Sequence, residues 1–65
     1  MKIQYFKNTD TLYIEFSATE IAESRDLDED TVIDLDADGR ICALTMEHAG
    51  KRTDVPNLTF EEIAA

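Results

Sequence analysis

A single cysteine, Cys42, is the feature that most limits how this 65-residue chain can fold, because one cysteine cannot form an internal disulfide. A folded chain of this length buries only about 60% of the surface that its unfolded state exposes. Such chains ordinarily gain further stability from disulfides, a metal ion or a second subunit. We therefore expect one small domain, residues 1–65, that forms a homodimer or a higher homo-oligomer.

The composition is typical of a folded chain without a membrane-spanning segment. Hydrophobic residues make up 43% of the sequence and aromatic residues 8%, which is too rich for a disordered protein. No stretch approaches the roughly 18 apolar residues that a membrane span requires, and the N-terminus lacks a signal-peptide pattern. With one free cysteine, which agrees with a reducing compartment, the sequence predicts a cytoplasmic protein without membrane contact.

The acidic residues are concentrated in the middle of the chain. The net charge is −9, and most of the excess lies between Glu20 and Asp38. This charge argues against direct binding to nucleic acids or anionic membranes, whose phosphates attract clustered lysine and arginine. A basic protein partner fits this charge, and the candidate residues for contacting it are Glu23, Asp26, Asp28, Glu29 and Asp30. Alternatively, these acids solvate the sheet and discourage aggregation.

The apolar residues recur mostly with a period of two, which is typical of β-strands. This pattern predicts strands at 2–7, 11–16, 21–27, 31–36 and 40–47. The third is poor in large apolar residues, so we expect it at an edge of the sheet. Asp38 and Gly39 stand between two apolar runs and predict a hairpin turn. The expected fold class is α+β, with a five-stranded antiparallel β-meander over about 2–47.

The last quarter of the chain has a different pattern. Residues 48–58 show no clear period and are expected to form a loop. Thr59 and Glu62 then fit a capping box at the start of a short helix over 59–65. A helix of this length needs tertiary contacts, so its apolar side is expected to dock on the sheet.

Three aspartates offer the first of two candidate chemistries. Asp34, Asp36 and Asp38 precede Gly39 with the spacing of the first half of a calcium-binding loop. The twelfth position of that loop should carry a bidentate carboxylate, but Thr45 stands there. The three aspartates therefore remain candidates for a divalent cation, while a hairpin with outward carboxylates explains them without one.

Cys42 and His48 are the second candidate, as soft metal ligands or as a nucleophile and base. Six residues of strand place them about 20 Å apart within one chain. We expect Cys42 in the core and His48 exposed or capping at the end of its strand. No phosphate-binding glycine loop, nucleophile elbow or paired-cysteine motif is present, so no enzymatic activity and no cofactor are expected.

Several short motifs resemble one known family. They are the Leu12-Tyr13-Ile14 strand, the Asp-x-Asp-x-Asp-Gly hairpin ending at Gly39, and the strand closing in Glu47-His48-Ala49. Over roughly Met1 to Arg52 the chain resembles the prokaryotic domain-of-unknown-function family 2283. The resemblance implies a compact β-rich fold without an established activity, and an antitoxin-like or chaperoning role.

These observations favour a non-catalytic, self-associating interaction module that docks a basic partner. A purely structural domain without a heterologous partner is one alternative. A divalent-cation-binding domain that uses Asp34, Asp36 and Asp38, or a small enzyme subunit, is the other.

Overall fold

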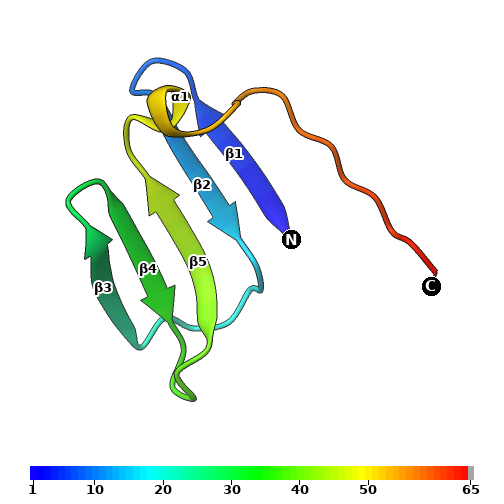
Figure 1. The fold of residues 1–65 in the computed structure, drawn as a ribbon. Coiled ribbons are helices and arrows are strands. Elements are labelled where there is room, and N and C mark those ends of the chain that lie inside the picture. Colours follow the sequence, from blue (N-terminus) through cyan, green and yellow to red (C-terminus); the bar gives the residue numbers. More distant parts are fainter. Residues whose placement is uncertain (65) are drawn as a thin grey trace.

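The computed structural model describes residues 1–64, which form one five-stranded antiparallel sheet and one short helix (Figure 1). The elements are β1 (Lys2–Phe6), β2 (Thr11–Glu15), β3 (Glu23–Asp28), β4 (Thr31–Leu35), β5 (Ile41–Met46) and α1 (Ala49–Arg52). All five predicted strands are present, with ends that differ by at most two residues. The protein is mostly β, so the α+β label fits it only loosely.

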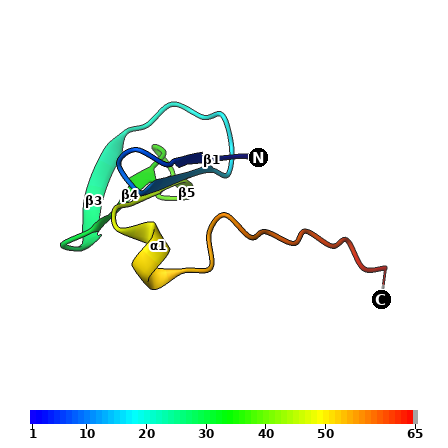
Figure 2. The ribbon, with the colours of Figure 1, turned by 90° about the horizontal axis from the view of Figure 1, so that it is seen from above.

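The predicted meander is wrong, because the strand order is β1-β2-β5-β4-β3. Residues 16–22 carry the chain from β2 to the far edge, and this connection passes over one side of the sheet (Figure 2). β5 then returns between β2 and β4. The physical reason is burial: β5 contains the buried Cys42 and Ala43, whereas every residue of β3 is exposed. A meander would place the hydrophilic β3 in the centre of the sheet. The observed order places β3 at an edge, which confirms the position predicted for this strand.

The register of the strands places most large apolar side chains on one face. We call this the helix face, and its members are Ile3, Tyr5, Leu12, Ile14, Thr31, Ile33, Leu44 and Met46. The helix α1 lies on this side of the sheet (Figure 2), where the Arg52 guanidinium donates to the buried Thr31 hydroxyl at 2.7 Å. Leu12 is also buried, but Ile3 on the edge strand is exposed. One short helix therefore covers only part of the helix face.

The predicted hairpin turn between β4 and β5 is confirmed, but Asp38 and Gly39 do not share one backbone conformation. Gly39 has φ +81°, whereas Asp38 is not among the described residues with positive φ. The Gly39 N–H donates to the Asp36 carbonyl at 3.0 Å, and the Asp36 N–H donates to the Arg40 carbonyl at 2.9 Å. The turn thus has three connecting residues, of which only the glycine is left-handed.

The helix predicted over 59–65 is wrong for the described residues, because 59–64 have no regular secondary structure and Ala65 lies outside the description. Leu58 and Phe60 are exposed, so the predicted packing of this segment on the sheet is missing. Without such contacts a helix of this length is not stable, whatever its capping residues.

The observed helix, α1, lies within the segment predicted as a loop. Ala49 is buried, and its N–H donates to the Asp10 carbonyl at 3.0 Å. The Thr53 hydroxyl and N–H both donate to the Ala49 carbonyl at 2.8 Å. Four residues cannot hold a helix alone, so these tertiary contacts stabilise it. Within residues 1–64, no helix has the length and apolar character needed to cross a membrane.

Candidate functional site

An open apolar groove lies on the helix face beyond the end of α1. Its floor consists of Ile3, Tyr5, Leu12 and Ile14, and the segment 55–58 forms its wall. The groove has a volume of about 270 Å³ and is lined mostly by apolar atoms. The groove leaves the apolar side chains of its floor open to solvent or to another molecule.

Asp10 joins β1 to α1 at the end of the helix face that α1 covers. Its carboxylate accepts a hydrogen bond from the Tyr5 hydroxyl at 2.6 Å and another from the Gly50 N–H at 2.9 Å. The bond from Tyr5, followed by the bond from Gly50, lowers the pKa of the Asp10 carboxyl. The hydrogen bond between Tyr5 and Asp10 also raises the pKa of the Tyr5 phenol. A Cβ at position 50 would lie 2.9 Å from Asp10 Oδ1, so a larger residue there would force the Asp10 carboxylate to shift.

A second contact ties α1 to the turn between β3 and β4. The Arg52 guanidinium donates to the Asp28 carboxylate at 2.9 and 3.3 Å while it also donates to Thr31. The Asp30 backbone N–H, then Arg52, lower the pKa of the Asp28 carboxyl. Since both charged side chains are more than a third exposed, solvent screens this ion pair and its contribution to stability is small.

The predicted partner-binding acids lie on β3 and in the turn after it, but several already have partners within the chain. Arg25 pairs with Glu23, Arg52 with Asp28, and His48 with Asp30. Asp26 and Glu29 form no ion pair within the described part of the chain. The charge available to a basic partner is therefore smaller than the sequence suggests.

The three aspartates of the β4–β5 hairpin have different contacts within the chain. The Ser24 hydroxyl donates to the Asp34 carboxylate at 2.6 Å. The Asp36 carboxylate accepts the N–H groups of Asp38 and Arg40 at 2.9 and 3.0 Å. Asp34, Asp36 and Asp38 do not form a three-ligand group in the structure of residues 1–64.

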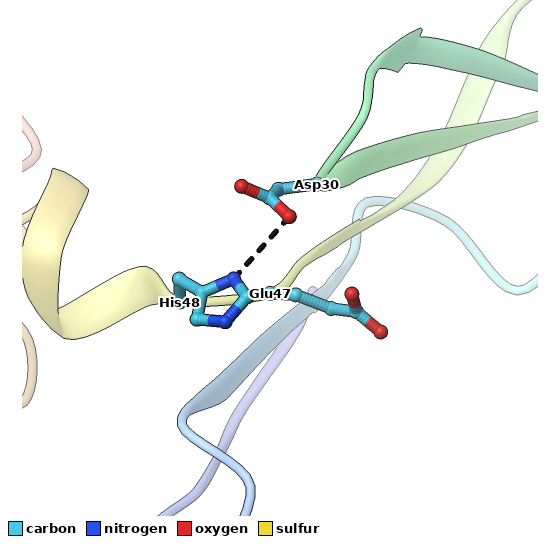
Figure 3. A group of neighbouring side chains, drawn as sticks. All are labelled: Asp30, Glu47 and His48. Atoms are coloured by element: carbon cyan, nitrogen blue, oxygen red, sulfur yellow. Dashed lines mark hydrogen bonds and ion pairs between the residues drawn. The ribbon is translucent and has the colours of Figure 1, made fainter.

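A different group of potential metal ligands comes together at the end of β5. One ligand atom from each of Asp30, Glu47 and His48 lies within 4.8 Å of the others. Figure 3 shows the Asp30 carboxylate facing the imidazole ring, with 3.2 Å between Oδ1 and Nδ1, whereas the Glu47 side chain points away. The Glu47 N–H donates to the Asp30 carbonyl at 2.7 Å and aligns the two segments. Imidazole and carboxylate are ligands that zinc accepts, but Glu47 and His48 are exposed here and Asp30 is half-buried.

Cys42 and His48 occupy the environments predicted for them. Cys42 is 1% exposed, and its thiol donates to the Asp34 carbonyl at 3.2 Å. His48 is exposed, precedes α1 in a left-handed conformation with φ 57°, and forms no side-chain cap. The thiol is therefore a core group, and the imidazole pairs with the β3–β4 turn.

Sequence reasoning missed both the groove and the Asp30–Glu47–His48 group. The groove combines β1 and β2 with residues 55–58, and no local pattern indicates that this segment returns to the sheet. The ligand group depends on the β4–β5 register, which joins residues distant in sequence. The exposed apolar residues after position 57 were the available signal, but the capping-box pattern favoured a helix.

Comparison with known proteins gives one match. Residues 2–49 match the family described as "Protein of unknown function (DUF2283)", which covers the sheet and the start of α1. No curated protein and no solved structure shows a significant match to the chain.

Proposed function

Because the chain belongs to the DUF2283 family of proteins of unknown function, we propose its role from its own geometry: it is a non-catalytic, self-associating interaction module. The helix face is the surface through which two copies meet. The acidic edge strand β3 remains outside this contact and is available to a basic partner.

The area of exposed surface is the observation that carries the proposal. The chain exposes 5186 Å². A folded monomer of this mass is expected to expose only about 4,200 Å², so about 1,000 Å² is in excess. A stable protein interface buries about 800 Å² on each partner. The excess is of the size that one such contact removes, and the extended, exposed residues 58–64 contribute to it.

The position of the apolar surface supports the helix face as the contact. The groove over β1 and β2 is open, and Ile3 on its floor is 41% exposed. The buried thiol of Cys42 supports a non-catalytic role, since a nucleophile must reach its substrate.

Sedimentation equilibrium from micromolar to submillimolar protein tests self-association. We expect a dimer, and we expect added salt to strengthen it, because each copy carries a net charge of −9 and screening weakens the repulsion. A folded chain that sediments as a monomer at every concentration and salt level would overturn the proposal.

Docking of a basic partner is tested with an oligo-lysine peptide as the probe. Asp26→Asn combined with Glu29→Gln removes the two acids of this edge that have no ion pair within residues 1–64. We expect the double variant to bind the peptide several-fold more weakly at low salt, and high salt to abolish binding of the unmodified chain. The control, Glu20→Gln with Asp38→Asn, removes the same charge from two exposed residues outside β3. Equal effects from both pairs would mean diffuse attraction and contradict a docking edge.

A further inference from the structure

The segment after the groove exposes apolar side chains and covers little of the sheet. We call residues 58–64 the C-terminal arm. It passes the β1 edge and runs away from the sheet (Figures 1 and 2). The arm makes no hydrogen bond to other residues of the described chain, and Leu58, Phe60 and Ile63 are all exposed, Phe60 by 81%. Solvated tails are ordinarily poor in such residues, so these side chains require another explanation.

The apolar groove continues toward the arm. Ile3 lines the groove and also a second hollow of about 320 Å³, which it shares with Met1 and Phe60. The two hollows therefore form one strip along β1. Leu58 is part of the groove wall, and Phe60 touches only the outer end of the strip. The chain's own arm leaves the sheet at this point and does not fill the groove.

Lysines lie on the β1 side of the molecule, and acids lie on the arm. Lys2 and Lys7 lie on and just after β1, Lys51 lies on α1, and none of the three forms an ion pair within residues 1–64. The arm carries Glu61 and Glu62. Because Lys2 and Lys7 lie at opposite ends of β1, the acids of an arm from a second copy that runs along this strand would pass near one of them. This arrangement would also keep the two acidic β3 strands away from direct contact, which lowers the electrostatic cost of association.

We propose that two copies exchange their arms, so that the arm of each chain lies on the helix face of the other with Phe60 against the strip along β1. This inference rests on the proposed self-association and names the segment that makes the contact. A two-fold axis generates each contact twice, since the same chain supplies both arm and groove. The three exposed apolar side chains of the arm and the open groove then cover each other.

The first test removes the arm or its main apolar side chain. A chain ending at Asn57 lacks the arm but keeps all the described strands and α1, and Phe60→Ser changes one side chain. The matched control is Leu27→Ser, because Leu27 is also apolar and 63% exposed but lies on β3. We expect the shortened chain to sediment as a folded monomer. We also expect Phe60→Ser to weaken the dimer at least about 30-fold, with less than about threefold change for Leu27→Ser.

The second test identifies the chain that each arm contacts. In a mixture of isotope-labelled and unlabelled protein, we expect nuclear Overhauser effects between the Phe60 ring of one copy and the Ile3 and Ile14 methyl groups of the other. A dimer that persists without the arm, or contacts found only within one chain, would overturn arm exchange and leave self-association standing. A full-length chain that is monomeric throughout would overturn both proposals.

Discussion

Leu12→Ala is expected to lower the free energy of unfolding by about 2–5 kcal/mol, because it removes a large, buried side chain from the helix face and leaves a cavity. Leu12 is 8% exposed and pairs with Tyr5 on one side and Met46 on the other. A domain of this length is stabilised by only roughly 3–10 kcal/mol in total. The variant is therefore expected to lie close to unfolding at room temperature.

Urea unfolding followed by circular dichroism measures this loss. All variants are compared at one protein concentration, since association with a second copy adds stability that depends on concentration. Ile41→Ala is the matched control: Ile41 is also an aliphatic strand residue but is 50% exposed, so its loss should cost less than about 1 kcal/mol. Similar losses for both variants would contradict the assignment of Leu12 to the core.

Asp10→Asn is the second substitution with a large expected effect, and its effect depends on pH. The carboxylate accepts the Tyr5 hydroxyl and the Gly50 N–H, and its residue stands in a left-handed conformation with φ 54°. Asparagine tolerates this conformation but removes the charge that both donors bind. We expect a clear loss of stability at neutral pH, with the contact between α1 and the β1–β2 turn weakened first.

The pH dependence follows from the direction of the Asp10 shift. The folded pKa lies below the ordinary value of 3.8, so the unfolded chain binds the proton more readily. The contribution of Asp10 is therefore complete above 3.8 and is lost as the pH falls through the folded pKa. Urea midpoints of the unmodified chain and Asp10→Asn should differ most near neutrality and converge in acid. Asp38→Asn, on an exposed turn, is the control, and a gap that stays constant with pH would refute this role.

The strands were predictable because their signal is local. Alternation of apolar residues such as Leu12 and Ile14 reports a half-buried strand without reference to its neighbours. The turn at Gly39 was predictable for the same reason, since a left-handed residue in a tight connection favours glycine. The burial of Cys42 also followed from its place within an apolar strand.

The helix and the candidate sites depended on contacts between distant residues. The capping box at Thr59 favours a helix only where the next turn packs against something, and Phe60 packs against almost nothing in the single chain. Residues 49–52 lack a clear periodicity but become helical because Ala49 meets Asp10 and Arg52 meets Asp28. The acids of β3 and of the turn after it appeared available in the sequence, while the fold brings Arg52 to Asp28 and His48 to Asp30.

The amino-acid sequence alone determined the five strands, the excess of negative charge in the middle of the chain and the inability to form an internal disulfide. These properties depend on residue type and on neighbours a few positions away. Only the tertiary structure decided that β5 lies between β2 and β4, that α1 forms over one end of the helix face, and that the groove along β1 stays open. Each of these depends on which surfaces bury each other, and that choice is made by the whole folded chain.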